Sequence, residues 1–135
     1  MLSLNQSTFR SRDVLHAGLR VQNPGSAFNA DFYLGILLPD GVSLFFFTSL
    51  SPLNGILTRV DADPRTFSCL ACNVLVPERL DVTIDDLLTA VLSDGLQSGT
   101  YILFAILTPP SVFSDGTIDP GDILALDAQA FTFSP

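Results

Sequence analysis

The sequence predicts an all-β domain of two packed antiparallel sheets, and three features lead to this prediction. The 135 residues include thirteen aspartates, one glutamate and no lysine, although 47% of them are hydrophobic. Glutamate and lysine favour helices, whereas aspartate favours turns and helix caps. Apolar runs of strand length also alternate with turn residues, among them nine glycines and nine prolines.

The first part of the chain predicts two strands, over residues 3–9 and 14–22. In the second strand, apolar side chains alternate with mostly polar ones, as they do in a strand with one buried face. The apolar set is Leu15, Ala17, Leu19 and Val21. The turn residues Asn23-Pro24-Gly25-Ser26 then end the strand.

Residues 31–38 and 42–49 predict a β-hairpin. The turn between them is Pro39-Asp40-Gly41, in which proline presets φ, aspartate binds its own backbone and glycine accepts a positive φ. The run Phe45-Phe46-Phe47 places aromatic rings on both faces of the second arm. We therefore expect this strand to be covered on both sides.

The middle of the chain is less regular. Short strands are expected at residues 55–60 and 70–76, between breaks at prolines and at Asn54-Gly55. Residues 85–92 fit either a short capped helix or a strand. We favour a strand at residues 87–92 because the surrounding pattern is β.

The last part of the chain contains the clearest strand. Residues 99–108 are apolar on both faces, which is typical of a central strand. A long loop over residues 109–121 and a final strand over residues 123–133 follow. About seven to nine short strands separated by turns favour a two-sheet antiparallel β-sandwich, with a jelly roll or small barrel as the alternative.

Residues 1–135 are expected to form a single domain, long enough to bury a core. No apolar stretch approaches the roughly 20 residues of a membrane helix, and residues 1–4 do not resemble a signal peptide. The domain can equally be excised from a longer secreted protein. A net charge of -8 argues against nucleic-acid binding, which needs clustered basic residues. The positive mean hydropathy suggests that a neighbouring module or subunit covers apolar surface.

Cys69 and Cys72 form a Cys-x-x-Cys pattern. Thioredoxin-like chemistry needs this pair at a helix N-terminus, and the surrounding pattern is β. A zinc site needs about four ligands, and the chain has only these two cysteines and one histidine. We expect either a disulfide that closes the loop or two inert thiols.

Asp115, Asp119 and Asp122 lie in the segment that most resembles a ligand site. With the Thr117 carbonyl, they offer the oxygen ligands that calcium prefers, although their spacing is not that of an EF-hand. Aspartates also form turns without any ion. Calcium and plain turn chemistry therefore both remain open, and no other cofactor is expected.

The remaining polar residues do not predict an enzyme. Asp61, Asp63, Asp85 and Asp86 are read as solvated turn residues, because nothing in the sequence places two of them beside a sugar cleft. His16 lies on the polar face of its strand and has no nucleophile at a recognisable spacing.

A resemblance to a known class comes from the run Asp94-Gly95-Leu96-Gln97-Ser98-Gly99-Thr100-Tyr101. A Gly-x-Tyr at the start of a late strand is similar to the tyrosine corner of immunoglobulin-like sandwiches, in which the phenol binds backbone a few residues upstream. The turns at residues 23–25 and 39–41 and the terminal Phe131-Thr132-Phe133 complete the pattern. The chain resembles immunoglobulin-like β-sandwich modules of large bacterial secreted or surface-anchored proteins, without the cysteine pair and core tryptophan of antibody domains.

The resemblance implies a non-catalytic extracellular module, located outside the cell or at its surface, with a structural or adhesive role. Its partner would be a neighbouring module or another protein, and homo-oligomers are compatible with it. Two alternatives remain. The first is a self-assembling subunit of a filament, pilus or surface layer, favoured by exposed strand edges. The second is a carbohydrate-binding module, which would stack sugars on aromatic rings such as Tyr33 and Tyr101.

Overall fold

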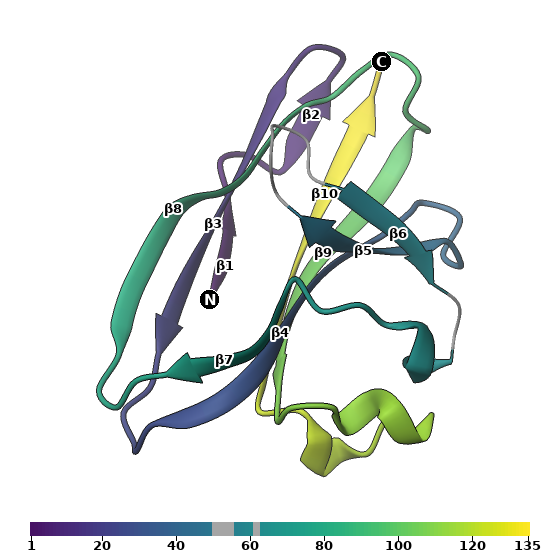
Figure 1. Ribbon diagram of the computed structural model, residues 1–135. Helices are drawn as coiled ribbons and strands as arrows, with labels where there is room; N and C mark the ends of the chain where they lie inside the picture. Colours follow the sequence, from purple (N-terminus) through teal and green to yellow (C-terminus); the bar gives the residue numbers. More distant parts are fainter. Residues whose placement is uncertain (50–55, 61–62) are drawn as a thin grey trace.

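The computed structural model describes residues 1–49, 56–60 and 63–135. Within them, the chain forms ten β-strands and three short 3₁₀ helices (Figure 1). The strands are β1 (Leu2–Leu4), β2 (Thr8–Arg10), β3 (Val14–Gln22), β4 (Phe28–Leu37), β5 (Leu44–Ser49), β6 (Ile56–Val60), β7 (Ala71–Val76), β8 (Asp81–Val91), β9 (Gly99–Thr108) and β10 (Ala125–Ser134). The 3₁₀ helices are η1 (Pro64–Thr66), η2 (Val112–Asp115) and η3 (Pro120–Asp122).

The strands form two sheets that pack face to face as a sandwich. The smaller sheet has the order β1-β3-β8, and the larger has the order β2-β10-β9-β4-β5-β6, with β7 added at β4. All pairs are antiparallel except β2 with β10. The described strands do not close into a barrel. The predicted all-β, two-sheet fold is therefore confirmed.

Two predicted strands have the predicted bounds. These are β3, and β9, which lies between β10 and β4 as expected of a central strand. Residues 85–91 belong to a strand and not to a helix, so the favoured alternative is confirmed except that the strand ends at Val91 and not at Leu92. This strand, β8, begins already at Asp81, because Asp81–Ile84 pair with Leu19–Gln22 of β3.

The prediction of one strand over residues 3–9 is wrong. The structure has β1 and β2 there, and they lie in different sheets. Asn5 donates to the His16 carbonyl in the smaller sheet, whereas the Ser7 carbonyl accepts from Thr132 in the larger sheet. The chain crosses the sandwich between these residues, so one strand cannot span them.

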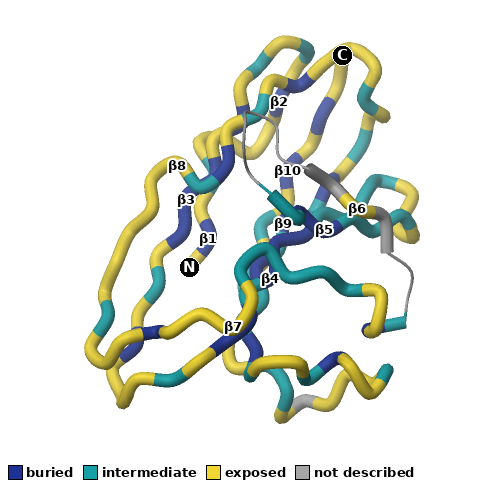
Figure 2. Tube along the Cα trace, in the orientation of Figure 1, coloured by how far each residue is buried: buried dark blue, intermediate teal, exposed yellow. Residues whose placement is uncertain are grey.

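Two hydrophobic clusters stabilise the molecule, on opposite faces of the larger sheet. Buried residues lie along the strands of both sheets (Figure 2). The main core lies between the sheets and includes Phe9, Leu34, Leu103 and Phe133, each at most 2% exposed. The second cluster centres on Tyr33, Phe46 and Phe113.

The second cluster explains how strand β5 is covered on both faces, as predicted. Phe46 belongs to this cluster and Phe47 to the main core. The segments with η1 and η2 supply Phe67 and Phe113, whose rings lie 5.3 Å apart. The long loop after β9 therefore forms part of a core.

Candidate functional site

Aspartate side chains in the turns accept hydrogen bonds from nearby backbone N–H groups. Asp40 Oδ1 accepts from the amides of Val42 and Ser43 at 2.9 and 2.8 Å, and Gly41 has φ +76°. Asp13 Oδ2 accepts from the Arg10 amide at 2.8 Å. These carboxylates stabilise the bends between strands, which is the role that the composition predicted.

The predicted calcium ligands serve separate turns. Asp115 Oδ1 accepts from the Thr117 amide at 2.9 Å, and this bond lowers the pKa of the Asp115 carboxyl. Asp122 Oδ2 accepts from the Asp119 amide at 3.3 Å. Across the described part of the chain, no three acidic, histidine or cysteine side chains come together as a metal site. Calcium binding by Asp115, Asp119 and Asp122 stays a prediction.

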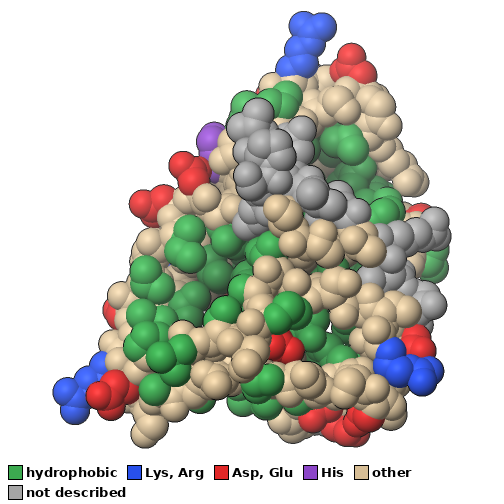
Figure 3. All heavy atoms as spheres, in the orientation of Figure 1, with side chains coloured by type: hydrophobic (Ala, Val, Ile, Leu, Met, Phe, Trp, Pro, Cys, Tyr) green, Lys and Arg blue, Asp and Glu red, His purple; other side chains and the backbone are tan. Residues whose placement is uncertain are grey.

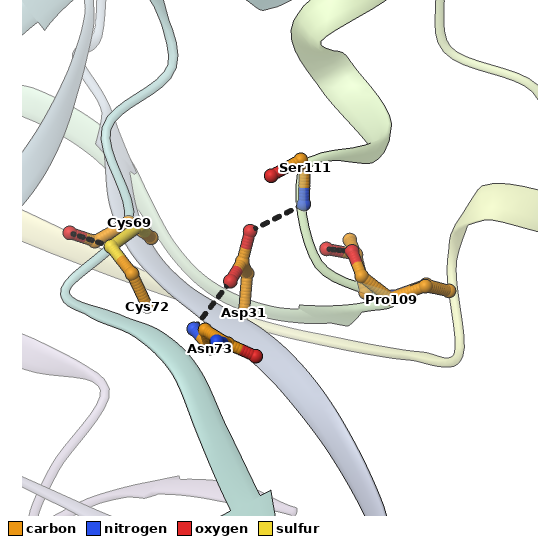
Figure 4. Close-up of a disulfide and its surroundings, with 7 residues drawn as sticks. Asp31, Cys69, Cys72, Asn73, Pro109 and Ser111 are labelled. Atoms are coloured by element: carbon orange, nitrogen blue, oxygen red, sulfur yellow. Dashed lines mark hydrogen bonds between the residues drawn. A yellow bond between two sulfur atoms is a disulfide. The ribbon is translucent and has the colours of Figure 1, made fainter.

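Cys69 and Cys72 are joined in a disulfide whose Cα atoms are 5.6 Å apart (Figure 4). The disulfide closes the turn that leads into β7, and Cys72 is solvent-exposed. It does not lie at a helix N-terminus, the position that lowers a thiol pKa in thioredoxin-like proteins. Its location is that of a cross-link in a β-turn.

Asp31 is the polar residue that sequence reasoning missed. Its side chain on β4 is only 5% exposed, and each of its carboxylate oxygens accepts a backbone hydrogen bond (Figure 4). Asn73 of β7 donates at 2.6 Å and Ser111, before η2, donates at 2.9 Å. The signal available in the sequence was that Asp31 directly precedes the apolar residues 32–38 of a predicted strand.

The single histidine takes part in a cross-strand cluster. His16 Nδ1 lies 3.2 Å from both Asp86 Oδ1 and Thr89 Oγ1, and Thr89 is its register partner on β8. In a catalytic triad the carboxylate and the hydroxyl contact different ring nitrogens. Here both face Nδ1, so Asp86 does not orient the ring for its other nitrogen to take a proton from Thr89, as the carboxylate of a triad does for its hydroxyl.

Tyr101 makes the contact expected of a tyrosine corner. Its hydroxyl donates to the Gln97 carbonyl at 2.6 Å, four residues upstream. Its ring stacks on Phe131, with the ring centroids 5.2 Å apart, and burial raises the pKa of the phenol. The role of this tyrosine is structural.

The other acidic positions are dispersed. Asp63 caps η1 and binds the Arg65 guanidinium at 2.8 Å, and this bond lowers the pKa of the Asp63 carboxyl. Asp85 and Asp86 are exposed on β8. Asp61 lies outside the described residues.

The aromatic rings point inward. Tyr33 and Tyr101 are each 4% exposed, and all eleven phenylalanines, which lie in the described residues, are buried or half-buried. The exposed apolar side chains are aliphatic, and on the face drawn in Figure 3 hydrophobic side chains gather between β8 and β4. The surfaces open to a partner are therefore aliphatic patches and strand edges.

Comparisons of the chain with protein families, with curated proteins and with solved structures gave no match. In the described part of the chain, no helix is long and apolar enough to cross a membrane.

Proposed function

We propose that this chain is a non-catalytic, immunoglobulin-like sandwich module with a structural or adhesive role outside the cell. In this role the module would belong to a large secreted or surface-anchored bacterial protein. It would act by burying apolar surface and pairing backbone with a neighbouring module or partner.

The strand order carries this proposal. Variable-type immunoglobulin domains place strands G, F, C, C′ and C″ in one sheet and A, B and E in the other. The orders β10-β9-β4-β5-β6 and β1-β3-β8 correspond to these sets. The bond from Tyr101 to the Gln97 carbonyl supports the same interpretation. Tyr101 lies near the start of β9, and the tyrosine of a tyrosine corner lies near the start of the corresponding strand F. One departure is that β7, in the place of strand D, pairs with β4.

The disulfide supports an extracellular location. Disulfides persist in oxidising compartments and are rare in the cytosol. The Cys69–Cys72 bond, with Cys72 exposed, can be used to test this location. Intact producing cells are treated with a membrane-impermeant maleimide before and after mild reduction. We expect labelling only after reduction; thiols labelled only in lysed cells, without reduction, would place the protein inside and contradict the proposal.

The role itself is tested by replacement. Residues 1–135 of the parent protein are exchanged for an unrelated β-sandwich of similar length, and attachment of the producing cells is measured. Retained attachment identifies a spacer, and lost attachment with normal surface display identifies an adhesive contact. Loss of a chemical conversion, with display and attachment unchanged, would show that the module is catalytic.

A second candidate function is a self-assembling subunit. The observation that favours it is the free outer edge of β8, which within the described residues pairs only with β3. The net charge of -8 opposes association of identical copies at low salt. Analytical sedimentation of the isolated chain at high concentration distinguishes these outcomes, because a subunit forms polymers whereas a module remains a monomer.

A further inference from the structure

We propose that the free edge of β8 binds an extended segment of a partner protein in which apolar residues alternate with lysine or arginine. The inference deepens the proposed contact function and rests on it. Three features support it: the backbone groups at the edge of β8, the apolar side chains on the inner face of this strand, and the acidic side chains along it.

The backbone of β8 has hydrogen-bonding groups that point away from the sandwich. Thr83 faces Arg20 in the register with β3, yet the Arg20 amide donates to Met1 on the other side of β3, at 2.8 Å. Arg20 and Thr83 therefore form a non-hydrogen-bonded pair. In such a pair the backbone N–H and C=O of Thr83 point away from β3, toward the open side of β8. Thr89 faces His16 in the same way, because the His16 carbonyl accepts from Asn5. Among the residues that the structure describes, Thr83 and Thr89 thus present unpaired backbone groups at the edge.

Strand β7, which could pair with the edge of β8, instead belongs to the larger sheet. Only four residues separate β7 from β8, so a hairpin between them would be an ordinary connection. Instead, the amides of Leu70 and Asn73 bind the Phe32 carbonyl at 2.8 Å and the Asp31 carboxylate at 2.6 Å. These contacts position β7 along β4 and leave β8 at an edge.

The surface behind β8 is apolar and open. Val82 and Ile84 pair with Val21 and Leu19, which places them on the inner face of their sheet, yet each remains 39% exposed. Val74, on the inner face of β7, is 37% exposed. Further along β8 an apolar cavity of about 390 Å³ lies between the sheets, and its lining includes Leu88 of β8 and Leu92, which follows the strand. The apolar side chains of an added strand would find apolar partners here.

The charge along the edge determines which strand fits. Asp85, Asp86 and Leu87 form a bulge opposite Gly18, and both carboxylates are exposed. Of the basic side chains that face β8, Arg20 is paired with Asp81, and His16 lies beside Asp86. A second copy would bring the same acidic bulge and a net charge of -8, whereas a basic segment neutralises this edge. Because a bulge impedes indiscriminate edge pairing, it also favours a matched partner.

The test uses the whole chain and a labelled eight-residue peptide that alternates lysine and valine, with binding measured by fluorescence anisotropy at low salt. T83P removes an outward N–H, and the matched control T83A retains it. We expect T83P to weaken binding about tenfold or more, and T83A to change it less than about twofold, since only the former removes a ladder hydrogen bond. The double variant D85N/D86N, which changes no backbone group, is expected to weaken binding about fivefold at low salt and little at high salt.

Two further measurements separate pairing from charge attraction. A peptide N-methylated at alternate residues, with unchanged charge, is expected to bind at least about tenfold more weakly. Bound peptide should also slow hydrogen exchange at the Thr83 and Thr89 amides. Equal binding of the N-methylated peptide, equal binding of a glutamate–valine peptide, or unchanged exchange at both amides would overturn the inference. So would a dimer of the free chain that protects the same amides.

These outcomes are independent of the tests of the proposed function. If the peptide fails to bind while maleimide labelling and module replacement give the expected results, only the β8 site is removed. If the labelling places the protein inside the cell, the proposed function fails whatever the peptide does.

Discussion

The Asp31 carboxylate on β4 accepts a hydrogen bond from the Asn73 amide on β7 at 2.6 Å, and Asn73 has φ +50°. The other carboxylate oxygen accepts from Ser111, whose φ is +63°. Non-glycine residues rarely adopt this left-handed conformation, because Cβ then approaches the backbone. A buried carboxylate thus compensates for two unfavourable backbone conformations, and joins β7 and the η2 loop to β4.

Replacing Asp31 should destabilise the protein more than replacing an exposed aspartate. In D31N the side-chain amide can accept through only one atom, which leaves one part-buried N–H without its present acceptor. We expect the free energy of unfolding in urea to fall by about 1–3 kcal/mol. D94N, at an exposed turn residue, is the matched control and should change the value little. Equal effects of the two variants would contradict the role assigned to Asp31.

Tyr101→Phe removes one hydroxyl and retains the stacked ring. Loss of its hydrogen bond to the Gln97 carbonyl should lower the free energy of unfolding by about 0.5–1.5 kcal/mol. Tyr33→Phe is the control, since the Tyr33 hydroxyl has no hydrogen-bond partner among the described residues and its ring is as buried. Chemical denaturation of both variants checks this, and a larger loss in Y33F would argue against a tyrosine corner.

The disulfide should contribute modestly to stability, because the loop that it closes is short. The chain-entropy relation gives about 2 kcal/mol for a loop of roughly four residues. The double variant C69S/C72S should therefore unfold at a lower urea concentration, and wild-type protein in a reducing agent should behave like it. A fully unfolded double variant would show that the disulfide is essential to the fold and not an accessory cross-link.

Gly35 on β4 cannot accept a larger side chain without rearrangement. A Cβ atom there would lie 2.3 Å from Cζ of Phe104 and 2.8 Å from Cε1 of Phe46. G35A should lower the free energy of unfolding by about 1–3 kcal/mol, as overpacking of a core does. The control is G95A, because no atom lies within 4 Å of the corresponding Cβ. Thermal unfolding of the pair provides the measurement, and a neutral G35A would contradict the close packing of this cluster.

Acid should weaken the fold through its paired aspartates. The Arg20 side chain lowers the pKa of the Asp81 carboxyl below its ordinary value of 3.8, by a hydrogen bond and by its charge. A carboxyl whose pKa is lower in the folded state contributes stability above the unfolded value, and that contribution is lost as the pH falls through the folded value. Stability should therefore decline below about pH 4.

Carbon-detected NMR titration tests the cause directly. In R20Q the pKa of Asp81 should rise toward 3.8, while that of Asp63, lowered by Arg65, should not move. An unchanged Asp81 pKa in R20Q would show that Arg20 is not the cause of its shift.

Local pattern was sufficient to predict the regular strands of this protein. The alternation in residues 14–22 and the apolar run in residues 99–108 predicted β3 and β9 with their observed bounds. Turn chemistry predicted the bend at Asp40 and Gly41 in the same way. These features depend on neighbouring residues, so the information that specifies them lies within a few positions of the chain.

Contacts between distant residues could not be predicted in this way. The division of residues 3–9 between two sheets depends on pairing with β3 and with β10, which are distant in sequence from each other. The position of β7 on β4 depends on Asp31 reaching Asn73, 42 residues further along the chain. The His16 cluster likewise depends on the register with β8.

The amino-acid sequence alone determined that the chain folds into strands joined by aspartate-rich turns, because periodicity and turn propensity act locally. Only the tertiary structure decided which edges are paired and which remain open. Both outcomes follow from packing. By joining β4, β7 satisfies its backbone and the buried Asp31 carboxylate, and this arrangement leaves the outer edge of β8 unpaired within the described residues.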